Sequence, residues 1–166
     1  MCIRDRGRLT HEGGLSSSTR AVWGGGTFYN PSVAYHDIID YVTIATTGNA
    51  TDFGDMTVNR KAMAAVSSST RGIWSGGYTP TYQNVKDYIT IATTGTATEF
   101  GDSNVAETYL GCMASPTRAL QGTGAYATNA IVYYNIATTG NYVDFGDAIE
   151  SRAQDSGTSN AHGGLG

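Results

Sequence analysis

The side chains best suited to chemistry are three pairs of carboxylates, each flanking a Phe-Gly dipeptide. The pairs are Asp52 with Asp55, Glu99 with Asp102, and Asp144 with Asp147. Repeated carboxylates could hold Ca²⁺, but no dense Asp-x-Asp-x-Asp-Gly loop accompanies them. In the alternative, each aspartate accepts backbone N–H bonds in a turn and each phenylalanine fills the space between neighbouring units. We favour this structural interpretation, and we expect no bound metal and no cofactor.

The remaining nucleophiles, bases and metal ligands are scattered along the chain. The histidines are His11, His36 and His162, and the cysteines are Cys2 and Cys112. No His-x-x-x-His, Cys-x-x-Cys or Ser/His/Asp pattern joins them, although zinc sites and catalytic triads need such convergence. The sequence therefore predicts a protein that is not an enzyme and has no catalytic residues.

A repeated pattern organises the chain. The pentapeptide Ile-Ala-Thr-Thr-Gly occurs at 44–48, 91–95 and 136–140, and Phe-Gly-Asp follows each copy after four residues. An arginine at the end of a Ser/Thr-rich turn precedes each copy, at Arg20, Arg71 and Arg118. We expect these arginines to have a structural task in every unit, such as bonding the Ser/Thr turn or a neighbouring carboxylate. A shared anion site is the alternative.

Only one segment of the unit changes in length. From the pentapeptide isoleucine to the next unit's arginine is 27 residues both times (44 to 71 and 91 to 118). From that arginine to the following isoleucine is 24, 20 and 18 residues (20 to 44, 71 to 91 and 118 to 136). A fixed scaffold with one adaptable connection per repeat behaves in this way.

The composition predicts an all-β protein. The chain has 22 Gly and 11 Tyr, with only 14% charged residues, and Thr, Val, Ile and Tyr favour strands over helices. In the clearest unit we expect four strands, at 61–66, 71–78, 85–93 and 96–100. Glycines mark the turns between strands because they tolerate positive φ.

This pattern resembles the kelch repeat. The matching features are a Gly-Gly pair after an apolar-aromatic strand, an Asp-Tyr strand, a Thr-Gly turn and a late aromatic residue, here Phe where kelch repeats usually have Trp. The resemblance implies a partial β-propeller with four-stranded blades at about 7–55, 56–102 and 103–147 and the start of a fourth at 148–166. Three blades do not close a ring. We therefore expect a truncated gene whose remaining blades belong to the same chain, and assembly of several chains is the less favoured alternative.

The variable segments at 27–36, 79–84 and 125–129 are the predicted binding loops. They place tyrosines beside Asn, Gln, Ser and Thr, a combination that suits glycan or protein recognition. In a four-stranded blade these loops share one end of the ring. The candidate binding residues are Phe28, Tyr29, Tyr35, His36, Tyr78, Tyr82 and Tyr126. In the alternative, the loops simply vary and the tyrosines cover the blade edge.

The amino-acid sequence of the repeat is also similar to that of repeat proteins from marine phage and environmental sequences. This resemblance implies a virion or tail-fibre component that binds a polysaccharide or surface protein, located in the virion or outside the cell. One alternative is a propeller enzyme of the galactose-oxidase type whose copper site lies in a missing part. Another is a purely architectural spacer without a ligand.

The net charge, the apolar content and the first six residues narrow the possible classes of protein. The net charge is -4 and no Lys/Arg run is present, so the basic footprint of a nucleic-acid-binding protein is missing. No apolar run approaches the roughly 20 residues of a membrane span. Residues 1–6 (Met-Cys-Ile-Arg-Asp-Arg) resemble a translated sequencing adapter, and we expect them to be a non-native scar.

Overall fold

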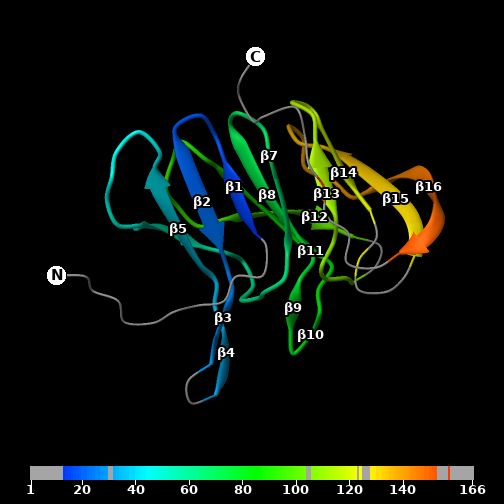
Figure 1. Cartoon of the computed structure of the whole chain (residues 1–166), viewed down its shortest axis with the longest axis horizontal. Helices are drawn as coiled ribbons and strands as arrows, with labels where there is room; N and C mark the ends of the chain where they lie inside the picture. Colours follow the sequence, from blue (N-terminus) through cyan, green and yellow to red (C-terminus); the bar gives the residue numbers. More distant parts are fainter. Residues whose placement is uncertain are drawn as a thin grey trace.

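The computed structural model describes residues 13–29, 32–103, 106–122, 124, 128–152 and 157. Within these ranges all regular structure is β-strand and no helix occurs, which confirms the predicted all-β class. Figure 1 shows three antiparallel sheets that follow one another in chain order. The predicted scar at residues 1–6 lies outside the described residues, as do Cys2, His11, Tyr126 and His162.

Each of the three sheets contains four strands in a simple up-and-down order. The first sheet consists of β1 (Gly14–Ser16), β2 (Arg20–Gly24), β5 (Ile38–Thr43) and β6 (Thr51–Asp55). The second consists of β7 (Ala64–Ser67), β8 (Arg71–Ser75), β11 (Val85–Thr90) and β12 (Thr98–Asp102). The third consists of β13 (Cys112–Ala114), β14 (Arg118–Gln121), β15 (Thr128–Asn135) and β16 (Val143–Arg152).

Two of the variable segments form hairpins of their own between the second and third strands of a sheet. β3 (Thr27–Tyr29) pairs with β4 (Val33–Tyr35), and β9 (Tyr78–Thr79) pairs with β10 (Thr81–Tyr82). Both hairpins extend from the same side of the array (Figure 1). The segments predicted as loops are therefore short β-ribbons that project beyond the sheets.

Strand limits in the second sheet differ from the predicted ones for a physical reason. The segment predicted as the first strand begins at Lys61, but Lys61 instead forms an isolated bridge with Tyr78 beside the hairpin, and the sheet strand begins at Ala64. The third strand ends at Thr90 rather than residue 93, and Ile91, directly after it, is 1% exposed within the core. Pairing with the hairpin residue Tyr78 accompanies the first limit, and burial of Ile91 between the sheets accompanies the second. The local sequence pattern reports neither contact.

The core lies between the sheets rather than within one of them. One apolar cluster joins the first and second sheets and includes Phe53, Trp74 and Ile89. A second cluster joins the second and third sheets and includes Phe100 and Tyr134. Because a single sheet buries little by itself, each unit is stabilised mainly by its neighbours.

The two junctions repeat the same backbone contacts. The amide of Gly95 donates to the carbonyl of Phe53 at 2.7 Å, and that of Gly140 donates to the carbonyl of Phe100 at 2.8 Å. Phe53 and Phe100 are only 3% and 2% exposed, which confirms that these phenylalanines fill the space between units. A Thr-Thr-Gly turn thus caps the last strand of the preceding sheet.

The repeated arginines also act across these junctions. Arg20 Nη1 donates to the carbonyl of Ile91 at 2.8 Å, and Arg71 Nη1 donates to the carbonyls of Ile136 and Ala137 at 2.9 and 2.8 Å. Each guanidinium also stacks over a tyrosine of its own sheet, 4.5 Å from the Tyr41 ring for Arg20. The guanidinium groups of Arg20 and Arg71 therefore join sheets through carbonyl oxygens. The expected bond to the Ser/Thr turn is also present, because the backbone amides of Arg20, Arg71 and Arg118 each donate to the turn serine at 3.0–3.2 Å.

Close approach at the junctions requires glycine in the Phe-Gly-Asp triplets. A Cβ at Gly54 would lie 2.4 Å from the carbonyl oxygen of Gly95, and one at Gly101 would lie 2.7 Å from that of Gly140. Both glycines have φ near +140° (+142° and +140°), which L-residues rarely adopt. The recurrence of this glycine is thus a consequence of sheet packing.

Candidate functional site

The structure brings three of the predicted binding residues together in one tyrosine cluster, formed by Tyr35, Tyr78 and Tyr82. The ring centroids of Tyr35 and Tyr78 are 6.0 Å apart, and those of Tyr78 and Tyr82 are 5.4 Å apart, both in edge-to-face geometry. Edge-to-face contacts at this distance are favourable for aromatic rings. The cluster is assembled from two hairpins that belong to different sheets.

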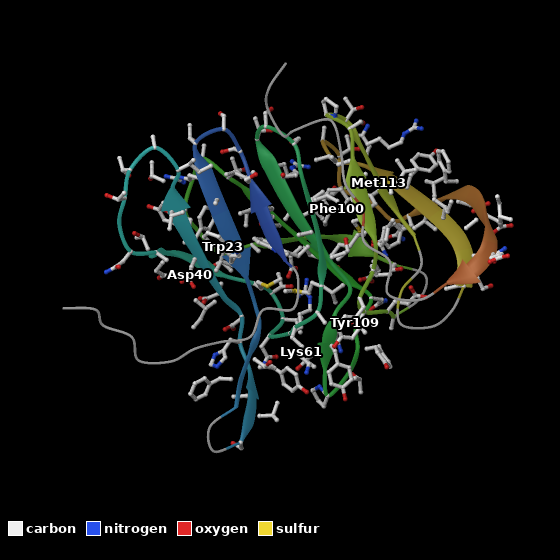
Figure 2. All side chains as sticks on the ribbon, viewed as in Figure 1. Trp23, Asp40, Lys61, Phe100, Tyr109 and Met113 are labelled. Carbon is white, nitrogen blue, oxygen red and sulfur yellow. The ribbon has the colours of Figure 1, made fainter. Side chains whose placement is uncertain are left out.

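The segment between the first two sheets positions the cluster. Lys61 exchanges two backbone hydrogen bonds with Tyr78, of 3.1 and 2.8 Å. Asn59 donates from Nδ2 to the carbonyl of Tyr35 at 3.4 Å. One short connection therefore fixes the base of both hairpins, and Figure 2 places Lys61 close to those bases.

A positive charge lies beside the aromatic rings. Lys61 Nζ is 6.0 Å from the ring centroid of Tyr35 and 5.9 Å from that of Tyr78. At partly exposed sites such cation–π contacts are worth about 0.5–1 kcal/mol, so they orient the ammonium group without burying it. The site offers aromatic faces, phenolic hydroxyls and one cation to a ligand.

The other predicted residues have different positions. His36 lies at the hairpin base, where its amide donates to Gly26 at 3.0 Å and its carbonyl accepts from Arg60 at 3.3 Å. Phe28 is half-buried opposite Ala34 in the β3–β4 ribbon. Tyr29 is placed only by its backbone pairing in this ribbon. Tyr126 lies outside the described residues, so Tyr35, Tyr78 and Tyr82 are the predicted residues that the structure joins.

A small polar pocket lies where the third variable segment leaves its sheet. Its volume is about 90 Å³, and Glu107, Gln121, Thr128 and Tyr142 contribute to its lining. Burial raises the pKa of the Glu107 carboxyl, and the hydroxyl of Tyr142 donates to Oε1 of Gln121. No sequence pattern indicates this pocket, because its residues come from different strands and the preceding linker.

A further hollow of about 290 Å³ lies at the first junction, away from the hairpins. It is lined by Phe53, Tyr88, Ile89, Gly95 and the threonines at 90, 93, 94, 96 and 98. Threonine hydroxyls and aromatic edges can bind a polar ligand but supply no general acid or base near neutral pH. Acid–base chemistry is therefore not supported at this hollow.

Lys86 is a buried cation and is not among the residues predicted from sequence. It is 0% exposed, and its Nζ donates to the carbonyl of Gly140 at 2.8 Å. Its Nζ also lies 3.9 Å from the ring centroid of Tyr142 and 4.7 Å from that of Tyr134. Desolvation lowers the pKa of its amine from 10.5 to about 8. The sequence signal that could have identified this buried lysine is that the other units have isoleucine at the same repeat position.

Replacing Lys86 by isoleucine should change how stability depends on pH. Because the amine pKa is lowered to about 8 in the folded chain, the unfolded chain binds more protons between about pH 8 and 10, and the free energy of unfolding should rise with pH there. Lys86→Ile should flatten this rise. Urea unfolding of both proteins at pH 7.5, 8.5 and 9.5 measures it, and parallel pH curves would contradict the assignment.

The described residues do not form a metal site or an activated nucleophile. No group of three or more His, Cys, Asp or Glu side chains in this part of the chain could hold a metal ion. Asp52 accepts a hydrogen bond from the Gly54 amide at 3.2 Å, which is the turn role predicted for these aspartates. Burial raises the pKa of the Cys112 thiol to about 12, so the thiolate is scarce at neutral pH.

Comparison with known proteins adds no family assignment to this geometry. Within the described ranges, no helix combines the length and apolar character needed to cross a membrane. No protein-family model matches the chain, and no curated protein sequence matches it.

Proposed function

We propose that the chain is a non-enzymatic scaffold, part of a kelch-like β-propeller, that binds a glycan through the face formed by its hairpins. The observation that carries the proposal is the tyrosine cluster with Lys61 at its edge. A glycan offers C–H faces to aromatic rings and hydroxyls or carboxylates to Lys61. A purely architectural spacer gives no reason for such a cluster.

The propeller part of the proposal is supported by the relation between the sheets. Successive sheets share no strand, and their first strands adjoin: β1 contacts β7, and β7 contacts β13. Ser67 Oγ donates to the carbonyl of Ser16 at 2.9 Å across the first of these contacts. Radial blades whose inner strands meet near one axis would have this arrangement.

The glycan is favoured over a protein ligand by the size and shape of the cluster. Tyr82 is 37% exposed and Tyr35 and Tyr78 are half-buried, so the three rings present little exposed apolar surface. Protein interfaces of standard size bury about 800 Å² on each partner. Such a face suits a receptor-binding part of a virion or tail fibre, where individual weak sites act together.

Replacing Tyr78 or Tyr82 by alanine should weaken glycan binding at least about tenfold, because anchoring aromatic residues carry most of the energy at such sites. The measurement is binding of the labelled full chain to a glycan array, followed by titration with the best oligosaccharide. Tyr82→Phe keeps the ring and should retain most of the affinity.

A matched truncation away from the site serves as the control. Met113 on β13 is 44% exposed, and Figure 2 places it far from Lys61 and the hairpins. Met113→Ala should leave glycan binding unchanged. The proposal is rejected if no glycan binds, or if the tyrosine variants bind as tightly as the original chain.

A further inference from the structure

The third sheet exposes a face that is buried in the first and second sheets. We define the trailing face of a sheet as the side turned toward the next sheet. On this face Phe53 and Phe100 are 3% and 2% exposed, whereas Phe145 at the same position in the third sheet is 52% exposed. A Cβ at Gly146 would have no atom within 4 Å. The third trailing face is therefore open.

The first sheet has the opposite open face. We define the leading face as the side turned toward the preceding sheet. Ile91 and Ile136 on leading faces are each 1% exposed, whereas the equivalent Ile44 is 54% exposed. Trp74 is 0% exposed, whereas the equivalent Trp23 is 37% exposed. The three described sheets thus leave two different faces exposed, one of each kind.

Two kinds of junction occur between the described sheets. In the first, Trp74 packs on Gly24, where a Cβ would lie 2.9 Å from its ring, and Ile39 and Ala97 share one core cluster.

In the second junction the corresponding residues are polar or larger. Ser75 and Lys86 on the trailing face meet Tyr134 and Tyr142, with 3.3 Å between the Ser75 and Tyr134 hydroxyls. Gln121 replaces the tryptophan and binds Tyr142. Lys86 thus lies beside Tyr142 in the second junction. The equivalent positions in the first junction are Ile39 and Ala97.

The two open faces carry the same residue types that meet in the first junction. The trailing face of the third sheet has Gly122 and Ile131 at the positions of Gly24 and Ile39. The leading face of the first sheet has Trp23 and Ala50 at the positions of Trp74 and Ala97. A Cβ at Gly122 would lie 4.0 Å from the Gly111 carbonyl oxygen, which is the nearest atom among the described residues, whereas a Cβ at Gly24 would lie 2.9 Å from the Trp74 ring.

The charged positions follow the same rule. The Arg60–Asp87 ion pair belongs to the first junction, and the second junction has Glu107 and Val132 at the equivalent positions. The positions next to the open faces hold Arg152 and Asp40, which restore the Arg/Asp combination. Size, polarity and charge therefore match at these positions, whereas Ala148 stands at the repeat position of Met56, which belongs to the first core cluster.

We propose that the trailing face of the third sheet binds the leading face of the first sheet of a second copy of this chain. Two copies joined through both pairs of open faces bring together six of the described four-stranded sheets, within the 4–8 blades of closed propellers. A head-to-tail contact closes when the rotation permits. The inference rests on the sheet arrangement of the proposed scaffold but not on its ligand, so loss of glycan binding leaves it standing.

Self-association of the full chain tests the proposal. Light scattering after size exclusion should give a dimer. Phe145→Glu and Ile44→Glu each place a carboxylate on one open face, and each should weaken the dimer about thirtyfold or more. Both side chains are about half exposed in the single chain, so circular dichroism should show an unchanged β-sheet content.

Mixing the two glutamate variants distinguishes a head-to-tail contact from a symmetric one. Each variant retains one intact face, so a 1:1 mixture should recover a heterodimer held by one unmodified junction. A monomeric original chain, a dimer that survives both substitutions, or assembly without a size limit would each overturn the proposal.

A compensating pair tests the matching rule itself. Ile131→Lys alone and Ala50→Tyr alone should each weaken the dimer about tenfold, because each combines residues of different junction types. The double variant recreates the lysine–tyrosine combination of the second junction and should regain most of this loss. Additive losses in the double variant would overturn the matching rule and, with it, the choice of a second copy as the occupant.

Discussion

Replacing Trp74 by alanine should lower the free energy of unfolding by about 3–5 kcal/mol, the range for truncating a buried tryptophan. Trp74 is 0% exposed, belongs to the core cluster between the first two sheets, and donates from Nε1 to the carbonyl of Gly13 at 2.6 Å. The substitution opens a cavity and leaves a buried carbonyl without its donor. Since small domains are stable by only about 5–15 kcal/mol, we expect a large shift in the urea midpoint.

The equivalent tryptophan of the first sheet is the matched control for this experiment. Trp23 occupies the same repeat position but is 37% exposed. In protein dilute enough to be monomeric, Trp23→Ala should cost about 1 kcal/mol, as is usual for partly exposed sites. Equal losses from the two substitutions would contradict the assignment of Trp74 to the junction core.

Removing either partner of the Arg60–Asp87 ion pair should destabilise the fold by about 3–5 kcal/mol, because an uncompensated charge remains buried. Both side chains are 0% exposed, and Nη1 of Arg60 lies 2.8 Å from Oδ2 of Asp87. Arg60 also donates from Nε to the carbonyl of Gly76 at 2.8 Å. Burial lowers the pKa of the Arg60 guanidinium, although the carboxylate opposes this shift.

A double substitution separates the cost of an orphaned charge from the value of the pair. Arg60→Met with Asp87→Leu removes both charges and fills similar volume, and such apolar replacements are often neutral or stabilising. We therefore expect the double variant to unfold at higher urea concentration than either Arg60→Met or Asp87→Leu. If the double variant loses the sum of the two single losses, the two side chains are not energetically coupled, and the destabilisation assigned to an orphaned charge is contradicted.

Buried Nη2 of Arg60 gives a further reason for this expectation. Among the described residues it is one of two buried polar side-chain atoms without a hydrogen-bond partner, the other being Oγ1 of Thr27. An unsatisfied buried donor costs about 1–3 kcal/mol. The native pair therefore carries a penalty that an apolar replacement does not have.

The amino-acid sequence by itself determined the class of the fold and the plan of each unit. Strand-forming residues, glycine turns and the Ile-Ala-Thr-Thr-Gly repeat are local signals, and they predicted three successive four-stranded units. The structural role of Phe53 and Asp52 also followed from residue type and recurrence. These predictions succeeded because backbone preference and turn chemistry act over a few residues.

The candidate site could be predicted only in part. The sequence identified Tyr35, Tyr78 and Tyr82 because tyrosine recurred in the segments of variable length. It gave no sign that Lys61 and Asn59 would hold two hairpins together, since Lys61 was predicted to begin a sheet strand and Asn59 to precede it. Lys61 instead pairs with the hairpin of its own unit, and Asn59 bonds the hairpin of the preceding unit.

Only the tertiary structure decided how the units meet. It showed that Arg20 reaches a carbonyl of the next sheet, that Lys86 is enclosed by tyrosines, and that Phe145 is exposed where Phe53 and Phe100 are buried. The three phenylalanines have the same local sequence, so local preference cannot distinguish them. The difference comes from burial against a neighbouring sheet, which depends on the position of a unit in the array and not on its own residues.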